Sequence, residues 1–498
     1  MSEFELKFEI PSASLQRVAA ALLDGKTSRQ RLQARYFDTQ EGALAKHGLV
    51  VRVRKEGRRW VQTAKGPTSG PLERLEHNVT LARQAQGGMP EVDLARHAGT
   101  PVGKSIVAAL KLKTDEVLPH LIALYETDVQ RITRLVEQAG SVVEIALDQG
   151  RILARPHALD LCELEVELKM GMPEHAVTLA RRWCAEHGLW LSSITKSMKG
   201  QHLRSGNPAG PAVSAAAPEF HRDATGAQIV VAVLQSCLKQ ILPNASELAG
   251  GTREPEHVHQ LRVGIRRLRT ALRELGRLSD GIDPAWEATL VGVFRELGRH
   301  RDHGHLERDL QPQLVAAGGP GVSFGQADAD IPDPGAVVRA PAFQDVLLCL
   351  IGFAHRAGQN EPEKKSSARE PAKKVLRQRL EKLRSQALKD GKNFLVLDET
   401  QQHRVRKRLK RLRYLSEFSA PFFSSRKLNA FIAALKPAQD ALGLHNDQLM
   451  ALQAYRRLAT EDGRAWFGVG WLTARRVPSA QLCLKEIEAF EKARPFWD

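Results

Sequence analysis

The chain has 498 residues, more than a single hydrophobic core usually organises, so we expect at least two domains. Its 42% hydrophobic and 26% charged residues are typical of a globular protein and exclude disorder throughout the chain. The 73 lysines and arginines outnumber the 57 acidic residues and give a formal net charge of +16, which predicts an anionic partner such as a nucleic acid, an anionic membrane or a phosphate-rich ligand.

The cysteines and the apolar runs bear on where the protein works. Its five cysteines lie far apart, without the close pairs of a zinc site or the even number of a disulfide framework. The longest strongly apolar run, Val346 to Ala354, is less than half a membrane span, and the N-terminus lacks the basic and apolar regions of a signal peptide. We therefore expect a cytoplasmic protein with no membrane partner.

Short segments of alternating polar and apolar residues fill the N-terminal part of the chain. Alternation with a period of two, bounded by glycine or proline, predicts antiparallel β-strands. The segments are residues 4–10, 49–57, 59–66, 76–83, 141–150 and 161–169.

The polar faces of these segments are sorted by charge. Side chains two positions apart share one face of a strand, so Glu3, Glu5 and Lys7 lie together, as do Arg52 and Arg54. One such strand alone would be an ordinary solvated face, but solvated faces usually mix both signs of charge, and the sorting recurs from strand to strand. Further acidic side chains that share a face are Glu144 with Asp148, and Glu163 with Glu165 and Glu167.

Carboxylates at this spacing can hold hard divalent cations, which prefer oxygen ligands. Arginine and lysine side chains opposite them can bind phosphate oxygens, and arginine can do so with two hydrogen bonds. A cavity lined by both kinds of side chain suits a metal-bound polyanion such as a triphosphate.

The N-terminal motifs resemble the CYTH domain, the fold of the triphosphate tunnel metalloenzymes. The resemblance covers roughly residues 1–203 and begins with Glu3-x-Glu5-x-Lys7. It continues, in order, with Tyr36-Phe37-Asp38-Thr39, Leu49-x-x-Arg52-x-Arg54, Trp60 followed by Lys65-Gly66, Arg74-x-Glu76, Thr127-Asp128-x-x-Arg131, Glu144-Ile145-Ala146-Leu147-Asp148, Glu163-x-Glu165-x-Glu167 and Ser193-x-x-Lys196.

The resemblance implies a closed eight-stranded antiparallel β-barrel whose lumen is a tunnel for triphosphate. The catalytic residues that it implies are Glu3, Glu5, Lys7, Glu144 and Asp148. The phosphate-binding residues that it implies are Lys7, Arg52, Arg54, Lys65, Arg131 and Lys196. The ligands that it implies for Mg²⁺ or Mn²⁺ are Glu3, Glu5, Glu76, Asp148, Glu163, Glu165 and Glu167.

Two departures from the family pattern leave details of the metal site open. Some members carry an acid where Ala146 stands, so Glu144 or Asp148 would replace it. Three acids alternate at Glu163, Glu165 and Glu167 where two usually suffice, which leaves their register undecided.

A segment without charge, Ser205 to Pro218, is built from Gly, Pro, Ala and Ser and predicts a linker between domains, which we place at residues 204–221. Beyond it, residues 228–242 and 258–275 have the period of an amphipathic helix. We therefore expect an α+β chain with an all-α helical bundle over residues 222–498. Stretches at 311–341 and 358–372 are rich in glycine and proline or in charge, and are predicted loops.

The helical part contains an internal repeat. The pattern His259-x-x-Arg262-x-x-x-Arg266-Arg267-x-Arg269 recurs 144 residues later as His403-x-x-Arg406-x-x-x-Lys410-Arg411-x-Arg413. Each copy is followed by Leu-Gly-x-x-x-Asp, which ends at Asp302 and at Asp447. Two similar halves, at about 222–345 and 370–495, explain this pattern.

The two repeated patterns place basic side chains along helix faces that contain no acid, and repulsion along such a face calls for a compensating anion. Acids from neighbouring helices, or a nucleic acid, are alternative counter-charges. The repeat resembles the CHAD domain over about residues 225–495, which implies binding of inorganic polyphosphate. The residues that match are His259, Arg262, Arg266, Arg267, Arg269, His403, Arg406, Lys410, Arg411 and Arg413, and we expect Asp302 and Asp447 to orient them.

The hypothesis favoured by the sequence is a metal-dependent inorganic triphosphatase that hydrolyses tripolyphosphate to pyrophosphate and phosphate, with an attached polyphosphate-binding domain. The first alternative is an enzyme acting on thiamine triphosphate or ATP, by hydrolysis or cyclisation. The second is a polyphosphate-binding scaffold with weak catalysis. A nucleic-acid partner comes third, because 27 aromatic residues offer little base stacking.

Overall fold

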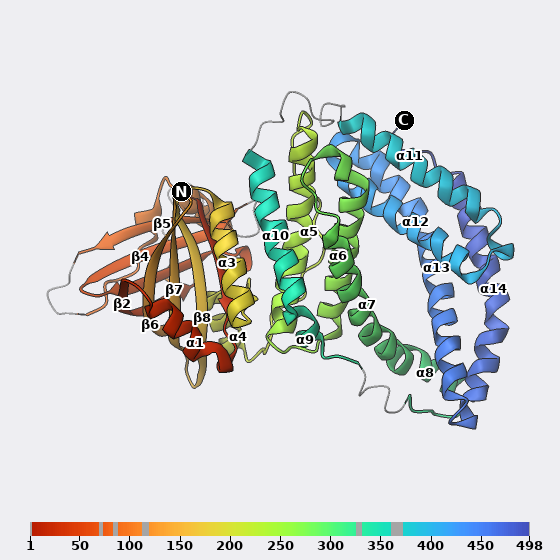
Figure 1. The fold of residues 1–498 in the computed structure, drawn as a ribbon, viewed down its shortest axis with the longest axis horizontal. Helices are drawn as coiled ribbons and strands as arrows, with labels where there is room; N and C mark the ends of the chain where they lie inside the picture. The colour runs from red at the N-terminus through yellow and green to blue at the C-terminus, as the bar shows by residue number, and fades with distance from the viewer. Residues whose placement is uncertain are drawn as a thin grey trace. The chain divides into compact units, whose positions relative to one another are not determined.

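The computed structural model of the chain describes residues 2–68, 73–82, 88–111, 119–324, 331–359 and 372–497 (Figure 1). By its internal contacts the chain forms two compact units. The first unit comprises Met1–Val213, Leu242–Thr252 and Val338–Arg356. The second unit comprises Ser214–Ile241, Arg253–Val337 and Ala357–Asp498. The sheet lies in the first unit, which also includes two helical segments from beyond the predicted linker.

The first unit is built on one antiparallel sheet. Its strand order is β5-β4-β3-β2-β6-β7-β8-β1-β9, and β1 pairs with β5 as well as with β8. All six strands predicted from alternation are confirmed, as β1, β3, β4, β5, β7 and β8. The strands are β1 (Ser2–Glu9), β2 (Thr27–Asp38), β3 (Val50–Glu56), β4 (Arg59–Pro67), β5 (Glu73–Leu81), β6 (Ile122–Gln138), β7 (Ser141–Ala154), β8 (His157–Met170) and β9 (Trp190–Leu191).

Two helices of the first unit pack on the apolar face of this sheet. Alternation places Leu164 and Val166 of β8, and Ile145 of β7, on that face, where none of them is exposed. Helices α1 (Leu15–Leu23) and α3 (Pro173–His187) pack there, as Figure 1 shows. The charged residues between these apolar positions consequently point to the opposite face. The remaining helices of this part of the chain are α2 (Pro101–Leu110) and α4 (Lys196–Ser205).

The helical region that follows confirms the change of period in the sequence. Both segments with a helical period, 228–242 and 258–275, lie within helices, α5 and α6. The helices are α5 (Gly226–Ala249), α6 (Pro255–Leu275), α7 (Ala285–His305), α8 (Gln311–Ala316), α9 (Pro334–Arg339), α10 (Pro341–Gln359), α11 (Ala372–Gly391), α12 (Glu399–Phe418), α13 (Ser425–Leu458) and α14 (Trp466–Glu491).

Helix α5 is long and apolar enough to cross a membrane by length and composition alone. No other helix in the described ranges meets both conditions. Two thirds of its most apolar stretch (67%) is buried inside the protein, as in the core helix of a globular protein.

The loop predicted at 311–341 is wrong in part, because this stretch contains α8 and α9. Proline lies in the first turn of α8, and α9 begins at Pro334. Proline is tolerated in the first turn of a helix, where its missing N–H would have no partner in any case. Three of the prolines that suggested a loop, Pro312, Pro334 and Pro341, therefore mark helix starts, whereas Pro320 and Pro332 lie outside helices. The second predicted loop, 358–372, lies largely outside the described residues.

Candidate functional site

The charged face of the sheet lines a cavity of about 430 Å³ in the first unit. Its lining comes from every strand from β1 to β8 and from the start of α4. Thirteen residues predicted from the sequence reach this one cavity, and the side chain of the fourteenth, Glu3, lies outside the described residues. The thirteen are Glu5, Lys7, Arg52, Arg54, Lys65, Glu76, Arg131, Glu144, Asp148, Glu163, Glu165, Glu167 and Lys196.

Strand register aligns the central charges of the cavity across four strands. Arg131 of β6 lies opposite Asp148 of β7, which in turn lies opposite Glu163 of β8. One step along the sheet, Glu165 of β8 lies opposite Lys7 of β1. The pairing of the backbone thus sets Arg131 beside Asp148 and Lys7 beside Glu165, and it also brings two acids, Asp148 and Glu163, side by side.

Three carboxylates converge at the centre of the cavity, and we call Asp148, Glu163 and Glu165 the carboxylate triad. One oxygen atom from each lies within 4.8 Å of the others. The side chains of Asp148 and Glu163 are fully buried, and that of Glu165 is 13% exposed. Oxygen atoms at this spacing are the donor set that Mg²⁺ and Mn²⁺ prefer, so the residues present fit a hard divalent cation.

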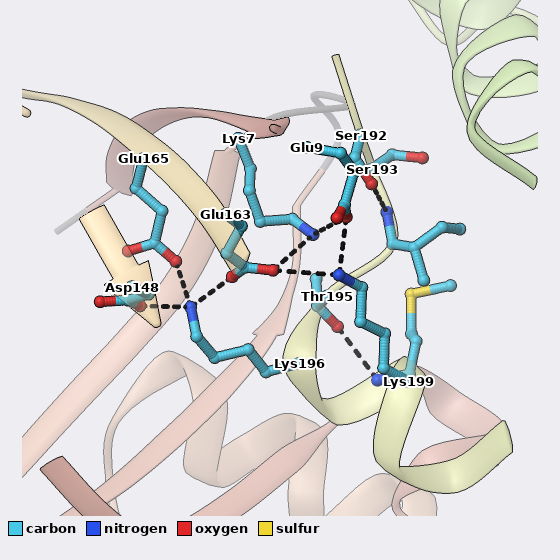
Figure 2. A network of polar contacts seen from close by, with 12 residues as sticks. Lys7, Glu9, Asp148, Glu163, Glu165, Ser192, Ser193, Thr195, Lys196 and Lys199 are labelled. Atoms are coloured by element: carbon cyan, nitrogen blue, oxygen red, sulfur yellow. Dashed lines mark hydrogen bonds and ion pairs between the residues drawn. The ribbon is translucent and has the colours of Figure 1, made fainter. Parts of the chain in front are cut away.

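Two basic side chains each contact more than one carboxylate of the triad. Arg131 donates two hydrogen bonds of 2.6 Å to the carboxylate of Asp148 and also contacts Glu165. The Lys196 Nζ lies 2.7 Å from Oδ2 of Asp148 and 2.6 Å from Oε1 of Glu165, and it also contacts Glu163 (Figure 2). Arg131 and Lys196 thereby neutralise most of the negative charge of the triad.

A second lysine on α4 extends this network, and the sequence analysis missed it. Nζ of Lys199 lies 2.6 Å from Oε1 of Glu9 and 3.2 Å from Oε2 of Glu163 (Figure 2). Nζ of Lys7 lies 3.5 Å from the same Glu163 oxygen. The signal was available, because a residue three positions after Lys196 shares its helix face.

Three local features of the first unit hold helix α4 at the cavity. Oγ1 of Thr195 caps the helix by accepting a hydrogen bond from the backbone N–H of Met198. The preceding loop is fixed where the N–H of Ser193 donates to Oγ of Ser246 at 2.9 Å. Gly200 packs on the ring of Tyr125, where a Cβ atom would lie only 2.3 Å from a ring carbon. Any side chain at residue 200 would therefore push away the helix that carries Lys196 and Lys199.

The three alternating acids of β8 have different surroundings. Glu163 and Glu165 belong to the triad, whereas the Glu167 carboxylate lies 2.8 Å from Nζ of Lys169. That lysine also pairs with Glu144 at 3.2 Å. Ala146 of β7, the position of the possible acid in the family pattern, lies opposite Glu165 of β8. Glu165 therefore supplies the carboxylate at this level of the sheet.

The strands on the other side of the cavity carry further ion pairs. Lys65 of β4 contacts Glu76 of β5, and Arg54 contacts Glu56 on the same strand. Burial raises the pKa of Glu76, but Lys65 and Arg52 outweigh that effect and bring the pKa to about 2. Glu76 is therefore charged at neutral pH.

The titrations of the central acids differ because their neighbours differ. Burial raises the pKa of Glu163, but Lys196, Lys7 and Lys199 together lower it to about 2. Burial and the charge of Glu165 raise the pKa of Glu5 to about 7. In the cation-free cavity Glu5 can therefore gain or lose a proton near neutral pH.

The described lining of the cavity carries eight acids and eight bases, so the two signs balance. A neutral lining does not by itself hold a highly charged anion. A polyanion would have to bring cations of its own. The acids are Glu5, Glu56, Glu76, Glu144, Asp148, Glu163, Glu165 and Glu167, and the bases are Lys7, Arg52, Arg54, Lys65, Arg74, Arg131, Lys169 and Lys196.

In the second unit, two of the repeated basic residues form buried ion pairs between α6 and α12. Arg267, 2% exposed, contacts Glu417 of α12, and Arg411 of α12 contacts Glu274 of α6 at 3.1 Å. Each helix thus supplies one arginine and one acid to the other. In the structure these two arginines join the helices to each other.

A group of basic side chains remains between α6, α7 and α12, and we call Arg262, Arg266, Arg301, Arg406 and Lys410 the cationic cluster. Burial and the charges of Arg406 and Arg266 lower the pKa of Lys410 to about 8. Burial also lowers the pKa of Arg262 to about 10, with Arg266, Arg301 and Arg406 adding to the effect. The side chains therefore repel one another.

Two acids approach the cationic cluster without neutralising it. Arg301, which the sequence analysis did not single out, lies 3.5 Å from Asp302 and 3.4 Å from Asp447. The Nε atoms of Arg266 and Arg406 are buried, and neither has a hydrogen-bond partner among the described residues. An anion would satisfy these donors.

The other predicted residues of the helical region have local partners. Arg269 pairs with Glu287 at 3.1 Å, and Arg413 pairs with Glu417 at 2.9 Å. His403 hydrogen-bonds Asn446 at 2.9 Å. Burial lowers the pKa of His259 and that of His403, so both rings favour the neutral form.

Comparisons with known proteins match two families to this chain. The CYTH domain family matches residues 1–200, and the CHAD domain family matches residues 232–456. An inorganic triphosphatase of Haemophilus influenzae is 29% identical over 175 residues, which are 34% of this chain and 45% of that protein. The chain thus spans less than half the length of this relative.

Similar solved structures include the CHAD domain from the plant Ricinus communis, with 26% identity and a TM-score of 0.47. The match covers 58% of this chain and 99% of that one. A Hippeastrum protein described as having a dominant triphosphatase activity is 17% identical, with a TM-score of 0.28, over 41% of this chain and 96% of that one.

Proposed function

The chain combines a CYTH domain over residues 1–200 with a CHAD domain over residues 232–456, and we propose that it hydrolyses inorganic triphosphate to pyrophosphate and phosphate. The observation that carries this proposal is the carboxylate triad inside a cavity lined by equal numbers of acids and bases. Such a lining suits a polyanion that arrives with divalent cations. The similarity to an inorganic triphosphatase supports the choice of reaction.

We further propose that the pairing of β1 with β5 closes the sheet into an eight-stranded barrel, so that the cavity is its lumen. Residues 2–4 of β1 pair with residues 73–75 of β5, while residues 5–9 pair with β8. Each end strand of the order β5 to β1 would then find its partner in the other, which leaves no free edge.

The roles of the side chains follow from their positions in the cavity. The triad would hold Mg²⁺ or Mn²⁺, which neutralises phosphate oxygens and activates the attacking water when bound. The same cavity is lined by Arg52, Arg54 and Lys65, which would bind the remaining phosphate oxygens. We propose the Glu5 carboxylate, which lines the same cavity, as the acceptor of the proton of the water.

The cavity favours an inorganic over an organic triphosphate. Its described lining is mostly charged or hydroxylic, and Tyr36 is its one aromatic side chain. Thiamine or adenine would need an apolar or stacking surface. We therefore favour tripolyphosphate as the substrate over thiamine triphosphate and ATP, whether these are hydrolysed or cyclised.

Phosphate release from tripolyphosphate, thiamine triphosphate and ATP tests the proposal. With Mn²⁺ or Mg²⁺ we expect tripolyphosphate to be turned over fastest, and a chelator should abolish release because the carboxylates then have no cation to hold. Turnover that persists in chelator would contradict the metal site. No turnover of any of the three would favour a polyphosphate-binding scaffold.

For the helical region we propose polyphosphate binding at the cationic cluster, supported by its unpartnered donors and its mutual repulsion. Two similar halves, one with α6 and one with α12, would present the cluster from both sides. Binding would concentrate polyphosphate near the enzyme.

Polyphosphate binding should weaken as pH rises through about 8. Lys410 faces Arg406, Arg266, Arg413 and Asp440, and its pKa of about 8 means that it loses its charge between pH 7 and 9. Loss of a cation lowers the affinity for an anion, so we expect a several-fold decrease for the full chain in chelator, measured by calorimetry with short-chain polyphosphate.

Two variants show whether this pH step belongs to Lys410. In Lys410→Met the step should disappear, because no titrating amine remains. The exposed Lys427 of α13 provides the matched control, and Lys427→Met should keep the step. A step of equal size in Lys410→Met would contradict polyphosphate binding at this lysine.

A further inference from the structure

Lys196 occupies the point where a cation in the triad would lie. Its Nζ is 2.6 Å from Glu165 and 2.7 Å from Asp148, and it contacts Glu163 as well. The triad oxygens lie within 4.8 Å of one another, which leaves room for one cation between them. The ammonium and a divalent cation therefore need the same place.

The contacts of Lys196 also leave it no free N–H donor for a phosphate oxygen. An ammonium has three N–H donors, and here three carboxylates surround it. Lys196 cannot bind a phosphate oxygen through those donors until at least one carboxylate is released. Phosphate binding by Lys196 thus requires another cation to take over the triad.

Binding of a divalent cation depends on phosphate in the same way. A cation that enters without phosphate must move a buried ammonium, with a side chain only 14% exposed, away from its three partners. That displacement costs free energy unless another anion receives the ammonium. The phosphate chain of the substrate is such an anion.

We propose that Lys196 is an internal counter-cation that couples metal binding to phosphate binding. In the metal-free cavity it neutralises the triad, and a divalent cation arriving with the phosphate chain displaces it, so that its three donors turn to phosphate oxygens. Metal alone binds weakly, and metal with phosphate binds cooperatively. The proposal rests on the proposed function of the cavity and makes Lys196 first a counter-charge of the triad and then a phosphate-binding residue.

Mn²⁺ binding in the absence of phosphate tests the proposal, measured by calorimetry on the full chain. Lys196→Met removes the competing charge and should bind Mn²⁺ about tenfold more tightly than the unmodified protein. Lys196→Gln should do the same while keeping a hydrogen-bond donor, which makes it the safer variant for folding. Lys196→Arg retains the charge and should stay within about twofold of the unmodified protein.

Lys169→Met is the matched control, because Lys169 lines the same cavity and pairs with Glu144 and Glu167. Its ion-pair partners are those two acids and not the triad, so its loss should leave Mn²⁺ affinity nearly unchanged.

Two outcomes separate this proposal from the proposed function. If the unmodified protein hydrolyses tripolyphosphate but Lys196→Gln binds Mn²⁺ no more tightly, Lys196 does not compete with the cation. If the unmodified protein neither binds Mn²⁺ nor releases phosphate, the proposed metal site does not exist. The proposed coupling between metal and phosphate is then contradicted as well. Equal tightening in Lys169→Met would also overturn the proposal, because the effect would then be general to the cavity.

Discussion

Glu165→Gln is expected to lower the turnover of tripolyphosphate by about a hundredfold or more. Glu165 supplies one of the three carboxylates of the triad, and the amide has nearly the same shape but no charge to bind a cation. Arg131 keeps its two hydrogen bonds to Asp148, so the fold should survive. Phosphate release at saturating Mn²⁺ measures the effect, and circular dichroism checks the fold.

The same substitution outside the cavity serves as its control. Glu126, also on the sheet, pairs with Arg35 in an ion pair whose side chains are 43% and 48% exposed. Glu126→Gln should leave turnover unchanged, because Glu126 does not line the cavity. Activity of Glu165→Gln within a few-fold of the unmodified protein would remove Glu165 from the metal site.

Arg131→Met should destabilise the sheet by about 3–5 kcal/mol, the cost of removing one partner from a buried ion pair. Arg131 contacts Asp148 and Glu165, and Asp148 is fully buried. Methionine would leave both carboxylates sharing Lys196 as their ion-pair partner among the described residues. Native-state hydrogen exchange of the β6–β8 amides measures the local opening free energy.

The exposed ion pair of Arg151 and Asp160 is the control for the effect of burial on the cost of losing an arginine. Their side chains are 67% and 87% exposed, so Arg151→Met should cost less than about 1 kcal/mol. The two arginines lie on neighbouring strands, so the difference between the variants reports the environment of the charge. Similar costs for both would mean that the cavity charges are well solvated.

The cavity could be predicted from the sequence because strands have a fixed period. Alternation alone assigns Glu163 and Glu165 to one face and Leu164 and Val166 to the other. The strands that this approach missed lack such alternation. The first half of β2 has polar residues on both faces, and most of them are exposed.

The positions that could not be predicted depend on packing between distant segments. Lys199 meets Glu9 only because α4 lies against the sheet, and that contact depends on Gly200 packing on Tyr125. The sequence pattern of α4 shows neither the distance nor the partner. Likewise, the sequence marks Lys196 as basic but not as the residue held among three carboxylates.

The repeated arginines illustrate the same limit in the helical region. Arg266 and Arg267 are adjacent in the sequence and equally basic. On a helix they point in directions about 100° apart. Arg267 therefore reaches Glu417, while Arg266 stays in the cationic cluster. Sequence spacing finds both residues, and only the position of the neighbouring helix decides which of them forms the ion pair with Glu417.

The reciprocal ion pairs between α6 and α12 bear on how the helical region would tolerate mutation. Arg267 and Glu274 of one helix pair with Glu417 and Arg411 of the other, which resembles an exchange of contacts across a two-fold axis. The match is approximate, because Arg267 precedes Glu274 by seven residues and Arg411 precedes Glu417 by six. Since each helix supplies both an arginine and an acid, the loss of one ion pair leaves the second in place between the same two helices.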